Sequence, residues 1–306
     1  MSKSRIAEND SHLKRGAKKK KRPTLKIILA VLLFLVLLIG AVGGKVYFDV
    51  KTAVTKAYVN PPTQMTSVSL KKKEAFTTAI LGISKIDGKD VLVSADMAAM
   101  NPRLQQTTVI NLSTSALLPD NQSLLTLYNS GGEAAVIKEM ENLLQVKTNK
   151  FIRIDLDQMG ELVQAIGGVS IQNANEFTAQ GFKFPQGTVA LNNTKEVAAY
   201  FTRLNTGDTK KAFARQQEVV MAVIGKLKSP LLLIRHYGQI LTVFPKVFKT
   251  TFNFGNVKAL ALNYHGAISI KKINIHSSKV AVQSEVTAIS QANLDLAKEQ
   301  FQESLK

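Results

Sequence analysis

The 306-residue sequence contains no cysteine, so it can form neither a disulfide nor a thiolate metal site, and it has no cysteine nucleophile. Its stability must come from an ordinary apolar core. The chain also lacks a Walker phosphate-binding loop and a G-x-S-x-G nucleophile motif. Its four histidines lie in the N-terminal tail or beyond the expected α/β region, which disfavours a histidine-based triad: His12, His236, His265 and His276.

One uncharged stretch, Ile27–Gly44, rises about 27 Å as a helix, close to the hydrocarbon thickness of a bilayer. Ten Lys or Arg precede it against two acidic residues, and such an excess holds its flank in the cytoplasm. No second run of this length follows. The pattern predicts a single-pass cell-membrane protein with a cytoplasmic N-terminus and an extracellular C-terminal domain. A cleaved signal peptide is the competing interpretation, but no A-x-A site follows the run.

The charge is strongly positive, at +18 for the chain, of which the first 26 residues supply +8 and the rest +10. The excess on the main part favours an anionic partner. The tail's cations are explained by topology and by anionic lipid headgroups, and no recognition helix or zinc spacing supports DNA binding. We therefore expect no nucleic-acid partner, and rank a DNA-binding regulator last among the alternatives. The lack of cysteine suits an exported Gram-positive protein.

Changes in composition predict five segments along the chain. They are a basic cytoplasmic tail (1–26), a transmembrane helix (27–44), a stalk (45–73), a folded core (74–228) and a C-terminal extension that covers the core and ends in a polar tail (229–306).

Short β-rich apolar runs predict strands, and apolar residues at helical spacing predict the helices between them. The expected strands are Phe76–Ile83, Asp90–Met97, Thr107–Leu112, Phe151–Leu156 and Val169–Ile171. The expected helices are Ala134–Leu144 after a flexible Gly131-Gly132 turn, Met159–Ile166 capped by Asp157, Thr194–Tyr200, and a longer one that Asp208 opens and that runs to about Lys228. The helix after Asp157 and the strands around it are interpreted as a βαβ unit. This alternation predicts an α/β layered fold, with helical and β-like segments from 231 to 275 covering the sheet's edge.

The strongest chemical constellation is on the last of these helices, where Asp208, Lys211 and Arg215 fall within an arc of roughly 60°. Arg203, just upstream, can join them. Guanidinium and ammonium groups around one spot suit a diphosphate, because arginine forks match phosphate oxygens. The alternative is a solvated helix face with an aspartate cap.

A second candidate is the acidic pair Asp87 and Asp90 beside Lys89. Two nearby carboxylates can bind a divalent cation, whereas the alternative role for these residues is a hairpin turn.

An ordered set of motifs resembles the LytR-CpsA-Psr family of cell-envelope proteins, over about residues 75–228. The motifs are Ala79-Ile80-Leu81-Gly82, Asn101-Pro102, Gly131-Gly132, Phe151 to Val169 with its Gly167-Gly168-Val169, Phe182 to Gly187, Lys195 to Arg203, and Gly207-Asp208 through Arg215-Gln216-Gln217. The resemblance implies an α-β-α layered domain with a central mixed sheet. It also implies transfer of a glycopolymer, of teichoic acid or capsular type, from a polyprenyl diphosphate carrier to peptidoglycan. In that family arginines hold the diphosphate, a divalent cation such as Mg²⁺ assists, and the lipid lies in an apolar cavity.

Carried over residue by residue, the resemblance makes Arg203, Asp208 and Arg215 candidate catalytic residues. Lys211, Gln216 and Lys89 are then candidates for binding the diphosphate, and Asp90 is the candidate metal ligand.

Several positions depart from the family pattern. The family's R-x-D-T falls on Val91, Val93 and Ser94, so its arginine and metal-binding aspartate are missing, and Lys89 and Asp90 can substitute only if the strand carries a bulge or shift. Its P-R-D-T falls on Ser113-Thr114-Ser115-Ala116, and the second arginine of R-x-R is Asn205. Each lost charged contact removes roughly 1.5 to 3 kcal/mol of binding. Two hypotheses remain: a glycopolymer transferase, and a non-catalytic relative that binds polyprenyl-linked or wall polymer and scaffolds or regulates envelope assembly.

Overall fold

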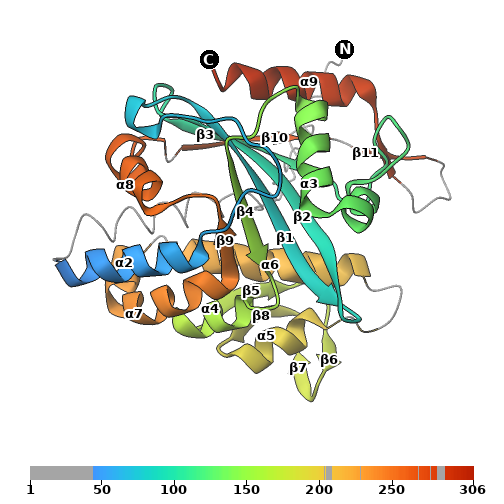
Figure 1. Cartoon of the computed structure of the whole chain (residues 1–306). Helices are drawn as coiled ribbons and strands as arrows, with labels where there is room; N and C mark the ends of the chain where they lie inside the picture. The colour runs from blue at the N-terminus through green and yellow to red at the C-terminus, as the bar shows by residue number, and fades with distance from the viewer. Residues whose placement is uncertain are drawn as a thin grey trace, which may run out of the picture.

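The computed structural model describes residues 44–202, 204, 209–227, 229–267, 269–275, 277–280 and 287–306. A six-stranded sheet with the order β10-β3-β2-β1-β4-β9 lies at its centre (Figure 1). Its strands are β1 (Phe76–Ile86), β2 (Lys89–Asn101), β3 (Gln106–Leu112), β4 (Lys150–Asp155), β9 (Phe248–Thr250) and β10 (Ser269–Asn274). The pairs β1–β4 and β3–β10 are parallel and the other neighbours antiparallel. The predicted central mixed sheet is confirmed.

Helices cover both faces of the sheet (Figure 1). Those described are α2 (Gly44–Ala57), α3 (Leu124–Leu144), α4 (Met159–Ala165), α5 (Thr194–Phe201), α6 (Thr209–Leu227), α7 (Pro230–Val247), α8 (Phe254–Asn263) and α9 (Gln291–Glu303), with a 3₁₀ turn at Leu70–Lys72. Because side chains alternate along a strand, β1 contributes Leu81 and Ile83 to a core beneath α3 and α9, and Ile80 to a larger core on the other face. The sheet is therefore the middle layer of the molecule.

Three two-stranded ribbons lie outside the main sheet. They pair β5 (Val169–Asn173) with β8 (Gly187–Leu191), β6 (Phe177–Ala179) with β7 (Phe182–Phe184), and β11 (Ser277–Lys279) with β12 (Thr287–Ile289). The predicted βαβ unit is wrong, because the strand after α4 pairs antiparallel with β8 instead of joining β4 in the central sheet. The glycines that close α4 have positive φ values, 72° at Gly167 and 81° at Gly168, and these turn the chain away from the sheet.

The segment 45–73, expected to be a stalk, instead begins with a helix that belongs to the fold. Helix α2 lies against α7, and its buried side chains recur at helical spacing: Val46, Val50, Ala53, Val54 and Ala57. The expected transmembrane helix lies outside the described residues except for Gly44. Among the described helices, none is long and apolar enough to cross a bilayer.

The C-terminal end, expected to be a polar tail, contains a regular helix. Helix α9 starts at a Ser290 cap and buries Leu294, Ala297 and Phe301 against the α3 side of the sheet. The composition is polar because only one face of this helix is apolar.

Candidate functional site

The candidate site lies where the carboxyl ends of β1 and β4 meet the start of β2 and helix α6 (Figure 1). Parallel neighbours end at the same edge of a sheet, and ligands of open α/β sheets bind at that edge. The described candidates that the structure brings to this region are Lys89, Asp90, Arg215 and Gln216, with Lys211 on the same helix. Arg203 and Asp208 lie outside the described residues.

A β-bulge separates the two halves of the β1–β2 hairpin. Gly82 pairs with Ser94 and Ile83 with Leu92, so Val93 has no partner on β1. The extra residue fulfils the condition under which Lys89 and Asp90 can reach the site. Val93 itself is buried in the apolar core, where it offers no charge to a ligand.

Beyond the bulge, Asp90 pairs with Lys85 on the face of the sheet that α3 covers. The Arg153 side chain on β4 emerges on the same face and donates to Asp90 Oδ2 over 2.8 Å and to Glu133 Oε1 over 3.1 Å. Glu133 follows Gly132, whose φ of 63° and ψ of −153° kink α3. The Gly131-Gly132 turn of the prediction is thus a kink inside a longer helix.

The carboxylates of this region are largely committed within the protein. Asp157 accepts from the Ser84 hydroxyl and from the Lys85 backbone N–H, both over 2.7 Å, and so it does not cap α4 as predicted. Burial, and then the charge of Asp157, raises the pKa of Asp155. No group of three or more acidic or histidine side chains in the described part of the chain is placed to hold a metal ion. These residues fit a Mg²⁺ ion poorly.

Gln216 connects α6 to β1. Its amide Nε2 donates to Ser84 Oγ over 3.1 Å, and the Ser84 hydroxyl in turn donates to Asp157. The Gln216 amide oxygen is buried, and no hydrogen-bond partner is recorded for it in the described structure. A polar atom in that position is costly to leave unpaired, so a ligand donor or a bound water at this spot would be favoured.

Arg215 points inward from α6. Its Nε donates to Tyr200 O over 2.8 Å, its Nη2 donates to Thr202 O over 2.7 Å, and its guanidinium lies 4.7 Å from the centre of the Phe177 ring. These contacts fix the end of α5 against α6. Lys211, one turn earlier, is exposed and available to an anionic ligand.

A polar network of Tyr200, Glu218 and Gln172 connects α5, α6 and β5 next to Arg215. The Tyr200 hydroxyl donates to Glu218 Oε2 over 3.2 Å, and Glu218 Oε1 accepts from the Gln172 backbone N–H over 3.0 Å. Burial raises the pKa of Tyr200 and that of Glu218, and the Tyr200 pKa is raised further by the neighbouring carboxylate. The tyrosine therefore stays protonated and serves as a donor.

Sequence reasoning missed Arg153, Ser84 and the true role of Asp157. One signal was available: Arg153 and Asp155 alternate with apolar residues in a strand expected to be buried, and a charge in such a strand needs a partner.

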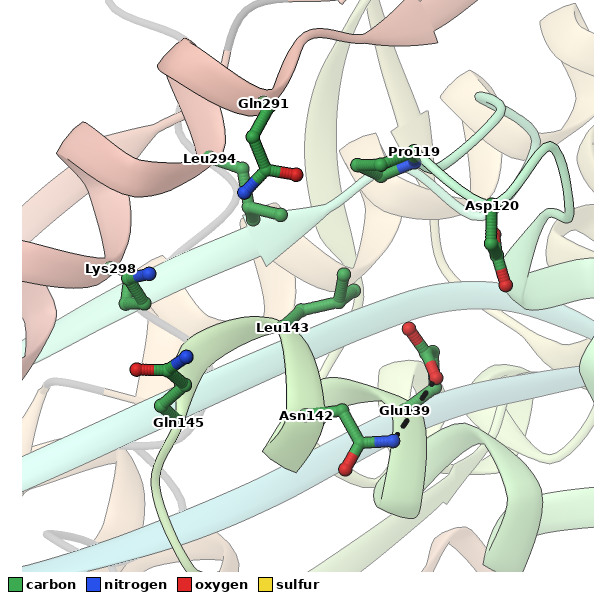
Figure 2. A pocket seen from close by; sticks show the side chains of 9 residues that line it. All are labelled: Pro119, Asp120, Glu139, Asn142, Leu143, Gln145, Gln291, Leu294 and Lys298. Atoms are coloured by element: carbon green, nitrogen blue, oxygen red, sulfur yellow. Dashed lines mark hydrogen bonds between the residues drawn. The ribbon is translucent and has the colours of Figure 1, made fainter.

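A separate hollow of about 230 Å³ lies between α3, α9 and the loop after β3 (Figure 2). Amide, charged and apolar side chains line it: Pro119, Asp120, Glu139, Asn142, Leu143, Gln145, Gln291, Leu294 and Lys298. None of these is a predicted site residue, and the Lys298 ammonium is paired with Asp295. The hollow contributes nothing to the site on α6.

The chain matches the model of the LytR_cpsA_psr family over residues 45–306 and belongs to this family. A curated relative from Enterococcus faecalis, named polyisoprenyl-teichoic acid–peptidoglycan teichoic acid transferase TagU, is 29% identical and covers 79% of this chain and 83% of its own. The protein of the same name from Bacillus subtilis is 28% identical, over 83% of this chain and 86% of its own.

Solved structures share the fold. A Streptococcus agalactiae protein aligns with a TM-score of 0.61 at 19% identity, over 79% of this chain and 91% of its own. B. subtilis TagV aligns with a TM-score of 0.58 at 19% identity, over 76% of this chain and 98% of its own. A structure described as TagT bound to LI-WTA aligns with a TM-score of 0.55 at 16% identity, over 79% of this chain and 94% of its own.

Proposed function

We propose that this chain binds a polyprenyl diphosphate-linked glycopolymer at the outer face of the cell membrane and assists its attachment to peptidoglycan without transferring it. The observation that carries this proposal is the ion pair between Arg153 and Asp90, which engages the candidate metal ligand of the sequence analysis with a cation of the protein itself. Asp157 is likewise engaged within the protein, by the Ser84 hydroxyl and the Lys85 backbone N–H.

Binding still has a physical basis. Lys85, Lys89 and Lys211 are exposed around the carboxyl edge of β1 and the adjoining helix, and ammonium groups attract a diphosphate as point charges. The curated relatives act, by name, on polyisoprenyl-linked teichoic acid, which supports teichoic acid as the polymer class.

A second candidate is a transferase of the type named for these relatives. Its support is the match of Arg215 and Gln216 to the family motif, together with the similarity to named transferases over most of their length.

The deciding experiment uses the full-length protein in nanodiscs with a short polyprenyl diphosphate sugar, peptidoglycan fragments, and either Mg²⁺ or EDTA. We expect saturable binding with no transferred product in either condition. Transfer that requires Mg²⁺ would favour the second candidate, and absence of binding would reject both.

The contribution of the lysines is tested by K89Q and K211Q in the same assay. Each should weaken carrier binding by about tenfold, as expected for one charge-assisted contact of roughly 1.5 kcal/mol. K271Q is the matched control, because Lys271 is an exposed lysine on the edge strand β10. If K89Q and K211Q bind the carrier as tightly as the control K271Q does, the diphosphate binds elsewhere.

A further inference from the structure

Three large apolar side chains project outward from α2 and α7. The exposed fractions are 63% for Phe48, 76% for Leu231 and 56% for Ile234. Phe48 and Leu231 lie opposite the buried stripes of their helices, which face the core through Val50 on α2 and Ile240 on α7, and Ile234 lies on the flank of α7. Both helices thus bury one apolar stripe in the core and also expose apolar side chains outside it.

The two helices are neighbours and run in the same direction. Both end at β9: Tyr58, directly after α2, bridges to Thr250, and α7 leads into that strand. Figure 1 shows their N-terminal ends together on one side of the molecule, at the left of the view. Phe48, Leu231 and Ile234 all lie in the N-terminal halves of these helices, and therefore toward that end of the pair.

The same end is basic. Toward this end α2 and α7 contain three cations against one acidic residue, Asp49, whereas Lys56 and Lys246 lie in the last turns of the two helices, at the other end. Lys45 and Lys51 on α2 and Arg235 on α7 are exposed beside the apolar side chains. Apolar anchors interleaved with cations on a helix surface are the pattern of proteins that lie in the interface of an anionic bilayer.

The position of α2 in the chain identifies the membrane as the partner of these exposed apolar side chains. The uncharged run Ile27–Gly44 ends where α2 begins, so a membrane-spanning run would deliver the first turn of α2 to the membrane surface.

We propose that the N-terminal ends of α2 and α7 dock on the anionic outer leaflet, with Phe48, Leu231 and Ile234 inserted among the lipids and Lys45, Lys51 and Arg235 on the headgroups. This docking rests on the membrane placement in the proposed function. It holds the folded part against the bilayer in one orientation, with β9 and the sheet behind the docked helices. A lipid-linked substrate would then meet the site at a fixed height.

The chain has no tryptophan, so a single introduced tryptophan reports on one position. Full-length F48W and L231W, in nanodiscs of anionic lipid with brominated acyl chains, should show blue-shifted emission and lose about half of it, because inserted side chains sit roughly 5–10 Å into the interface. L296W is the matched control, since Leu296 is 57% exposed but lies on α9, away from α2 and α7 (Figure 1). Its emission should be unquenched.

The outcomes separate docking from anchoring. Co-purification with the nanodisc and no quenching at residue 48 or 231 would overturn docking while leaving the membrane anchor intact. Failure to remain with the nanodisc would instead reject the placement itself. A blue shift without bromine quenching would mean that another protein copy covers the patch, which also overturns the proposal. Replacing Lys45, Lys51 and Arg235 by glutamine should reduce quenching at Phe48→Trp in anionic discs, and an unchanged signal would contradict the role of charge.

Discussion

The Arg153 guanidinium donates to the Asp90 carboxylate over 2.8 Å, so a cation from β4 reaches across β1 to the start of β2. The same guanidinium binds Glu133 on α3. Three elements are thereby joined at the carboxyl edge of the sheet by one side chain. In this position the guanidinium supplies the positive charge that a metal ion would bring to the two carboxylates.

The first prediction concerns removal of that charge. R153Q should lose about 1 kcal/mol of unfolding free energy, because the pairs are partly exposed and screened by water. Addition of Mg²⁺ should also raise the melting temperature of R153Q more than that of the wild type. The reason is that R153Q leaves the Asp90 and Glu133 carboxylates without the Arg153 guanidinium. Thermal unfolding with Mg²⁺ or EDTA measures both effects.

The control for this experiment is the double variant D90N/R153Q. It removes one of the two carboxylates and should cancel the added response to Mg²⁺. A Mg²⁺ response that is equal in the wild type and R153Q would show that the guanidinium does not compete with a cation there.

The second prediction tests the coupling between Ser84 and Gln216. S84A should cost about 1 to 3 kcal/mol, because it leaves the buried Gln216 amide without its acceptor. Q216M removes that amide, so S84A/Q216M should cost less than the sum of the single changes by about 0.5 kcal/mol or more. Chemical unfolding of the four proteins gives the coupling energy, and strict additivity would contradict the contact.

The sequence was sufficient for the central strands and most helices, because short β-rich apolar runs mark the strands and apolar residues recur at helical spacing along the helices. The sequence was not sufficient where the apolar pattern does not determine which strands pair with each other. The run Val169–Ile171 is a strand, as predicted, but its partner is β8, a choice set by the two positive-φ glycines before it and by the residues across the ribbon. Helix α9 was underestimated for a related reason: three buried side chains suffice to hold a helix whose other residues are polar.

The site was predictable only in part. Spacing placed Lys211 and Arg215 on one side of a helix, but it could not show that Arg215 turns inward to backbone carbonyls while Lys211 stays exposed. The pairing of Asp90 with Arg153 joins residues 63 positions apart, and depends on a one-residue bulge at Val93. Such long-range geometry is invisible to periodicity.

The third prediction separates a structural from a ligand-binding role of Arg215. R215K keeps the charge but loses the planar fork that reaches Tyr200 O and Thr202 O, so unfolding free energy should fall by about 2 kcal/mol. Carrier binding by the folded protein should fall less than in K211Q. A stable R215K protein that no longer binds the carrier would instead assign Arg215 to the diphosphate.

The fourth prediction follows from Asp96, which is buried on β2 and accepts from Asn111 Nδ2 over 2.9 Å. Burial raises its pKa to about 7, although Asn111 and the charge of Lys272 act in the opposite direction. The folded state therefore binds a proton more tightly than the unfolded chain, whose aspartate has a pKa near 3.8. The stability that this proton contributes is fully present below about pH 4 and is lost as the pH rises through 7.

D96N should remove that pH dependence, because an asparagine can accept the same hydrogen bond without ionising. From pH 4 to pH 8, the difference in unfolding free energy between D96N and the wild type should shift by roughly 2 to 4 kcal/mol in favour of the variant. Urea unfolding across this range measures the shift, and D120N, which changes an exposed aspartate, serves as the control. Parallel curves for D96N and the wild type would mean that Asp96 ionises below pH 4 in the folded protein, with Lys272 and Asn111 outweighing burial.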